Sequence, residues 1–184
     1  RTGAQKTMGR PMPARGRRTR HLSERHAPGN RPAAAARPNY AMILVTITLI
    51  AAAVRVVHLA QPVRYDEAYT FNNYATGPLW DALSDYSEPN NHLLHTLTVW
   101  ASVRLFGPAA WSLRLPVLLA GVALVPLVYV CGRRLVGRRA ALIAAGLAAG
   151  WPYLVHYATN ARGYVFQAVI LLALLPMALP LGRR

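Results

Sequence analysis

The chain of 184 residues is 54% hydrophobic and only 15% charged, yet it carries a formal net charge of +15. Soluble domains average roughly 25% charged residues, so this composition argues against an ordinary soluble domain and favours a membrane protein. The basic residues lie in one tail and in short clusters between apolar runs, without interleaved aromatic residues, so no nucleic-acid partner is predicted.

Residues 1–39 hold ten of the 21 Lys and Arg residues and are rich in Pro, Gly and Ala. They lack apolar periodicity and cannot bury enough surface to offset the entropy cost of ordering. The sequence therefore predicts a disordered basic cytoplasmic tail, which would contact the headgroups of membrane lipids. Residues 40–184 are predicted to form an all-α, polytopic membrane domain.

Four apolar runs are each close to the length of about 20 residues that spans a bilayer. These predicted spans are residues 40–60, 111–131, 140–158 and 165–181. The first run is followed by a polar, aromatic segment that predicts two short amphipathic helices, 66–74 and 79–86, broken at Gly77-Pro78.

Residues 89–106 are ambiguous, because their apolar stretch is short and carries His92, His95 and Arg104. The positive-inside rule places the tail, Arg133–Arg139 and Arg183–Arg184 in the cytoplasm only if 89–106 lies on the outer surface. This arrangement has four spans, a cytoplasmic N-terminus, an outer-face loop at 61–110 and a second outer turn at 159–164. A fifth span at 89–106 is the alternative.

This topology gathers polar side chains at the outer face of the cell membrane. They are Asp66, Glu67, Asn90, Asn91, His92, Asn160 and Arg162. An Asp-Glu pair alone is a weak signal, but clustered charged and amide groups at a membrane surface indicate a site. His92 and His95 have helical metal-ligand spacing, yet only Glu88 is a nearby carboxylate, so neither a metal nor another cofactor is predicted.

Three segments, VRYDEAYTFNNYA, EPNNHLLHTLTVWASVRLFGPAAWSLRLPVLLAG and YATNARGY, together resemble the bacterial GT-C glycosyltransferases. This is the protein O-mannosyltransferase and aminoarabinose-transferase-like superfamily, and the resemblance covers roughly residues 40–181. It implies a multi-pass enzyme that uses a polyprenyl-phosphate sugar donor at the outer membrane face. Because such enzymes have several more helices, the chain is expected to be the N-terminal part of a longer protein.

The resemblance also implies roles for individual residues. Asp66 matches the acidic residue placed as catalytic base, and Glu67 would support it. The Asn90-Asn91-His92 stretch matches a polar motif that lines the same cavity. Arg162 and Tyr164 match a motif in which the arginine would meet a phosphate.

Two other polar residues are interpreted differently. Asn160 departs from relatives that carry a carboxylate nearby, which argues against a two-carboxylate mechanism and against a metal site. Arg114 precedes Pro116 and is expected to be structural.

The chemistry of sugar transfer fits these residue types. A carboxylate can deprotonate an acceptor hydroxyl and stabilise an oxocarbenium-like transition state, while an arginine can hold the leaving phosphate. Attack opposite the phosphate would invert the anomeric centre.

Two alternatives to an active transferase stay open. One is a non-enzymatic membrane protein, either a transporter part or an assembly subunit, for which Arg55 within a span is the main argument. The other is an inactive truncated homologue.

Overall fold

The computed structural model describes Gly3, residues 38–87 and residues 91–178. Most of the predicted tail at 1–39 therefore lies outside the described residues. The regular elements of the described part are all helical, as predicted: α1 (Tyr40–Val57), η1 (His58–Ala60), α2 (Tyr65–Thr70), η2 (Phe71–Ala75), α3 (Leu79–Ser84), α4 (Leu93–Phe106), α5 (Ala110–Leu135), α6 (Arg138–Gly150), α7 (Pro152–Tyr157) and α8 (Tyr164–Ala178).

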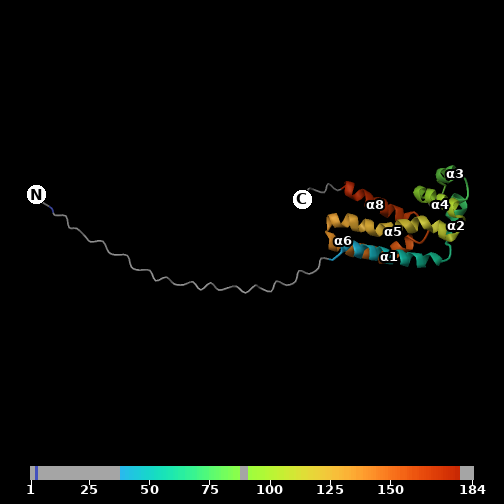
Figure 1. The fold of residues 1–184 in the computed structure, drawn as a ribbon. Helices are drawn as coiled ribbons and strands as arrows, with labels where there is room; N and C mark the ends of the chain where they lie inside the picture. Colours follow the sequence, from blue (N-terminus) through green and yellow to red (C-terminus); the bar gives the residue numbers. More distant parts are fainter. Residues whose placement is uncertain (1–2, 4–37, 88–90, 179–184) are drawn as a thin grey trace. The chain divides into compact units, whose positions relative to one another are not determined.

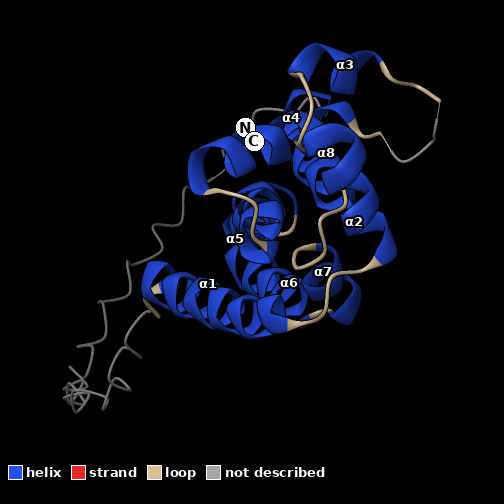
Figure 2. Cartoon of the chain, turned by 90° about the vertical axis from the view of Figure 1, so that its right-hand side faces the viewer, coloured by secondary structure: helices blue, strands red, loops and turns tan. Residues whose placement is uncertain are grey.

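Helix α5 lies at the centre of the helices and packs against α1, α4, α6 and α8 (Figure 2). The turn between α5 and α6 lies at one end of α5, whereas α2, α3 and α4 gather at the other end (Figure 1). The beginning of α8 lies at that second end too. Segments distant in sequence therefore meet beside the N-terminal half of α5.

Two helical segments are long and apolar enough to cross a membrane, namely Tyr40–Ala60 and Ala110–Leu135. Many apolar side chains of α1 are exposed, including those of Met42, Leu49 and Val57, as expected for contact with lipid. Helix α4 has 14 residues, which extend only about 21 Å at 1.5 Å per residue. Helices α6 and α8, which lie in predicted spans, are of similar length with 13 and 15 residues. The surface position of α4 and the count of four spans therefore stay predictions.

The predicted span at 140–158 is interrupted, because α6 ends at Gly150 and α7 begins at Pro152. Proline has no amide hydrogen, so the carbonyl of Ala148 lacks the donor that a continuous helix would supply. The side chain of Arg55, in α1, supplies a donor in place of the missing amide. Its Nη2 donates to the Ala148 carbonyl at 3.3 Å, and its Nη1 donates to the Ala149 carbonyl at 3.0 Å. Arg55 is completely buried and acts as a packing residue between α1 and α6.

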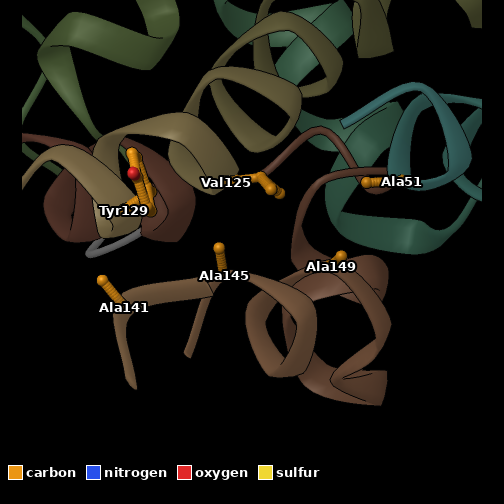
Figure 3. Packing of buried hydrophobic residues seen from close by; sticks show 6 residues of the cluster. All are labelled: Ala51, Val125, Tyr129, Ala141, Ala145 and Ala149. Atoms are coloured by element: carbon orange, nitrogen blue, oxygen red, sulfur yellow. The ribbon is translucent and has the colours of Figure 1, made fainter. Parts of the chain in front are cut away.

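Small side chains allow the helices to approach closely. One buried cluster of mostly alanines joins α1, α5 and α6, and consists of Ala51, Val125, Tyr129, Ala141, Ala145 and Ala149 (Figure 3). Gly121 of α5 faces the residues after α7, and a Cβ there would lie 2.2 Å from the Cβ of Ala158. Glycine at 121 is therefore required for α5 to contact the 158–163 loop.

We expect Gly121→Ala to lower the unfolding temperature in detergent, because the added methyl group must push Ala158 away from α5. Overpacking of this kind costs about 1–3 kcal/mol. Gly146→Ala is the matched control, since a Cβ at that helical glycine meets nothing within 4 Å. The control should leave the unfolding temperature unchanged or raise it, through better helix propensity. Equal unfolding temperatures for the two variants would contradict the close approach at Gly121.

Candidate functional site

Glu67, in the first turn of α2, is the anchor of the site and is only 1% exposed. Its carboxylate accepts hydrogen bonds from Arg114 Nε at 2.7 Å and Arg114 Nη2 at 2.6 Å. It also accepts from the backbone amides of Ala161 and Arg64, both at 2.9 Å. One carboxylate thus fastens α2 to α5 and to the 158–163 loop.

These hydrogen bonds determine the charge of Glu67. Burial alone would raise the pKa of its carboxyl group, but the hydrogen bonds from Arg114, Ala161 and Arg64 outweigh burial and lower the pKa below its ordinary value. Glu67 is therefore ionised in the folded protein at neutral pH.

Arg114 supplies the other half of this buried ion pair, and its guanidinium group is fully used. Besides the two bonds to Glu67, Nη1 donates to the carbonyls of Leu59 and Gln61 at 2.6 and 2.8 Å. Nη2 also donates to the carbonyl of Pro62 at 3.0 Å. A guanidinium group has five N–H donors, and all five have acceptors here. Arg114 has the structural role that the sequence predicted.

Asp66 and Arg162 form a second ion pair, and this one reaches solvent. Their side chains are 30% and 29% exposed, respectively. Asp66 directly precedes the anchored Glu67, and Arg162 directly follows Ala161, whose amide bonds to Glu67. The buried ion pair therefore positions both members of the accessible one.

His92 and Tyr164 lie beside Arg162. The centres of the His92 and Tyr164 rings are 5.3 Å apart, and the Arg162 guanidinium carbon lies 6.0 Å from the centre of the Tyr164 ring. A Cβ at Gly163 would lie only 2.6 Å from the Cβ of His92. The glycine of the TNARGY segment thus lets the loop pack directly on His92.

Two of the three asparagines predicted for the site are described, and they lie in different parts of the structure. Asn91 Nδ2 donates to the carbonyls of Ala82 and Asp85, both at 2.7 Å, and Asn91 Oδ1 accepts from Thr96 at 2.7 Å. Both ends of this amide hold α3 to α4, so its predicted contact with the donor stays untested. Asn160 is buried in the 158–163 loop, and Asn90 lies outside the described residues.

The two histidines with helical spacing have different environments. His95 is almost fully buried against Phe166. Burial lowers the pKa of His95 to about 4, although the Ala161 carbonyl and Glu67 partly oppose this, so the ring is neutral at physiological pH. The described residues contain no group of three or more His, Cys, Asp or Glu side chains that could hold a metal ion.

The sequence indicated no role for Arg64 and only an interfacial position for His156, although the structure pairs the two at the edge of the site. Arg64 Nη1 lies 3.2 Å from His156 Nε2. The signal in the sequence was an arginine directly before the Tyr-Asp-Glu segment, but its partner lies 92 residues away. No local spacing rule predicts such a contact.

We expect Glu67→Gln to destabilise the fold by about 3–5 kcal/mol, because it leaves the buried Arg114 charge without its partner. The folded-state pKa of Glu67 is lowered, so its stabilising effect is complete above the ordinary value of 4.5 and is lost as the pH falls through the folded value. Unfolding temperatures between pH 3 and 7 should therefore fall less steeply with acid in Glu67→Gln than in the wild type.

Asp81→Asn is the control for this measurement, since Asp81 is an exposed carboxylate of α3. It should keep the acid dependence of the wild type. Parallel pH profiles for Glu67→Gln and the wild type would show that another group governs the acid sensitivity.

Residues 88–181, half of the chain, match the family described as dolichyl-phosphate-mannose-protein mannosyltransferase. The matched range includes His92, Arg162 and Tyr164 and begins after Asp66 and Glu67. No curated protein and no solved structure matches the chain. The match covers α4 to α8 and includes both arginines of the two ion pairs, Arg114 in α5 and Arg162 in the loop between α7 and α8. The chain thus belongs to the dolichyl-phosphate-mannose-protein mannosyltransferase family, which consists of membrane glycosyltransferases of the GT-C type.

Proposed function

We propose that the protein transfers a sugar from a polyprenyl-phosphate-linked donor to an acceptor at the outer face of the cytoplasmic membrane, with inversion at the anomeric carbon. The observation that carries this proposal is the accessible Asp66–Arg162 ion pair. It puts a carboxylate and a guanidinium group side by side at a partly open position. The family match supports glycosyl transfer in a membrane.

Asp66 is the proposed catalytic base. As the acceptor oxygen attacks the anomeric carbon, the hydroxyl proton moves to the Asp66 carboxylate. The bond between that carbon and the phosphate oxygen breaks with its electron pair on the phosphate. Negative charge beside the ring also favours the oxocarbenium character of the transition state.

Arg162 is the proposed partner of the donor phosphate, since a guanidinium group can donate two parallel hydrogen bonds to phosphate oxygens. An inverting displacement requires the base and the leaving group on opposite sides of the sugar. Asp66 and Arg162 are in direct contact, so they have to separate when the donor binds. The phosphate would then replace the Asp66 carboxylate as partner of Arg162 and free the carboxylate for the acceptor hydroxyl.

The transporter alternative rested on Arg55 as a polar residue within a span. Arg55 is buried and donates to carbonyls of α1 and α6. It therefore serves helix packing, and this leaves the enzyme as the better supported function.

The topology is part of the proposal. The last turn of α5 carries Arg133 and Arg134, and α6 begins with Arg138 and Arg139. The basic turn between these helix ends lies at the end of α5 away from α2 (Figure 1). With this basic turn in the cytoplasm, α2 and the 158–163 loop face outward.

Replacement of the base should abolish transfer. In membranes that contain the complete protein, Asp66→Asn should lower transfer of radiolabelled sugar from polyprenyl-phosphate donors by about 10²- to 10⁴-fold, the usual contribution of general base catalysis. Asp81→Asn, at equal expression, should retain transfer. Equal labelling by Asp66→Asn and the wild type would remove Asp66 from the reaction. No labelling by any variant, including the wild type, across several donors would contradict the proposed activity.

Replacement of Arg162 should weaken the use of the polyprenyl-phosphate sugar donor. Arg162→Gln removes hydrogen bonds to a charged group worth about 1.5–3 kcal/mol, which corresponds to about a 10- to 100-fold loss in kcat/KM for the donor. Arg162→Lys should be intermediate, because it keeps the charge without the paired donors. Arg104→Gln, at an exposed arginine that bonds to the carbonyls of Thr76 and Gly77, is the control. An unchanged donor kcat/KM in Arg162→Gln would place the phosphate elsewhere.

A further inference from the structure

A cavity of about 670 Å³ lies between the C-terminal end of α1 and α7, next to the start of α2. Its lining combines apolar and polar side chains: Val54, Pro152, Tyr153 and Val155 on the apolar side, and His58, Gln61, Arg64, His156 and Thr159 on the polar side. No carboxylate is among these lining residues, and the guanidinium group of Arg64 supplies a permanent positive charge to the lining.

Arg64 is held by neutral acceptors. Its Nη2 donates to Gln61 Oε1 at 3.4 Å, and its Nη1 lies 3.2 Å from His156 Nε2. An arginine can only donate, so His156 Nε2 accepts and its ring is neutral. The two carboxylates close to Arg64 in sequence form ion pairs with other arginines: Glu67 pairs with Arg114, and Asp66 pairs with Arg162.

Gln61 fixes the direction of the Arg64 side chain. Gln61 Nε2 donates to both the carbonyl and the hydroxyl oxygen of Thr159, each at 3.2 Å. The other end of the amide, Oε1, is therefore turned toward Arg64. This arrangement holds the Arg64 guanidinium group at the wall of the cavity, with no carboxylate of the described residues paired to it.

The apolar side of the cavity continues the exposed apolar surface of α1. Val54 is 37% exposed and Tyr153 is 67% exposed, so the cavity opens where a lipid chain could enter beside α1. An amphipathic ligand with an anionic head suits such a lining better than a small free anion does.

From this juxtaposition we propose that the cavity binds an anionic phospholipid, with its phosphate on Arg64 and its chains along Val54 and Tyr153. The phosphate oxygens would replace the neutral acceptors Gln61 and His156, because a guanidinium–phosphate pair is charge-assisted and can be bidentate. This inference requires no sugar transfer and is independent of the proposed function.

The test compares lipid retention by the purified protein in detergent, using native mass spectrometry with phosphatidylglycerol, phosphatidylcholine and inorganic phosphate as probes. We expect the wild type to retain phosphatidylglycerol in preference to phosphatidylcholine. Arg64→Gln should bind phosphatidylglycerol about 10- to 100-fold more weakly, the usual effect of losing hydrogen bonds to a charged group. Arg104→Gln, which changes an arginine outside the cavity, should bind it like the wild type.

Two further variants keep the outcome interpretable. Gln61→Glu puts a competing carboxylate next to Arg64 and should weaken lipid binding while Arg64 remains. Asp66→Asn should bind phosphatidylglycerol like the wild type even if it abolishes transfer, which separates this proposal from the catalytic one. Unfolding temperatures without lipid verify that each variant is folded.

Three results would overturn the proposal. Equal losses in Arg64→Gln and Arg104→Gln would indicate general surface charge. Equal retention of both phospholipids would remove the role of the anionic head. Saturable binding of inorganic phosphate that displaces phosphatidylglycerol without any contribution from the chains would indicate a free-anion site.

Discussion

The buried ion pair between Glu67 and Arg114 is the constraint on which the rest of the site depends. Taking two charges out of water is costly, and the cost is met only when every donor and acceptor has a partner. Here the guanidinium group uses all five donors, and the carboxylate also accepts two backbone amides. The accessible pair of Asp66 and Arg162 is placed by its direct sequence neighbours, so its geometry follows from the buried pair.

Four arginine side chains of the helical part differ in the groups to which they donate hydrogen bonds. Arg55 donates through its two terminal nitrogens to carbonyls where a helix is broken, while its buried Nε has no hydrogen-bond partner among the described residues. Arg114 donates to carbonyls and a carboxylate. Arg162 has a carboxylate partner at a partly exposed position, whereas the partners of the Arg64 guanidinium group in the described part of the chain are the neutral side chains of Gln61 and His156. The first two arginines are committed to the fold, while the last two have charges that an incoming anion could use.

The sequence predicted the helical class, the break at Gly77-Pro78 and the family, because these depend on composition, local turn chemistry and ordered motifs. It did not predict that Glu67 joins Arg114, since 47 residues separate them and no periodicity links them. The span at 140–158 was predicted as continuous because its apolarity is continuous, although Pro152 interrupts it. Asn91 was assigned to the site through the family resemblance, and that role stays a prediction. The contacts that hold its amide between α3 and α4 could not be predicted from the local sequence.

The interruption before α7 has a consequence for biogenesis. In a bilayer a free carbonyl oxygen has no water to bind, so in the predicted span at 140–158 the Ala148 carbonyl would need a donor from the protein. That donor is the guanidinium group of Arg55, which comes from α1. Arg55 in turn is a charge that lipid alone would not accept. Each of the two helices thus holds a polar group that the other one binds, and in the proposed topology, with both in the membrane, they would leave the insertion machinery as a pair.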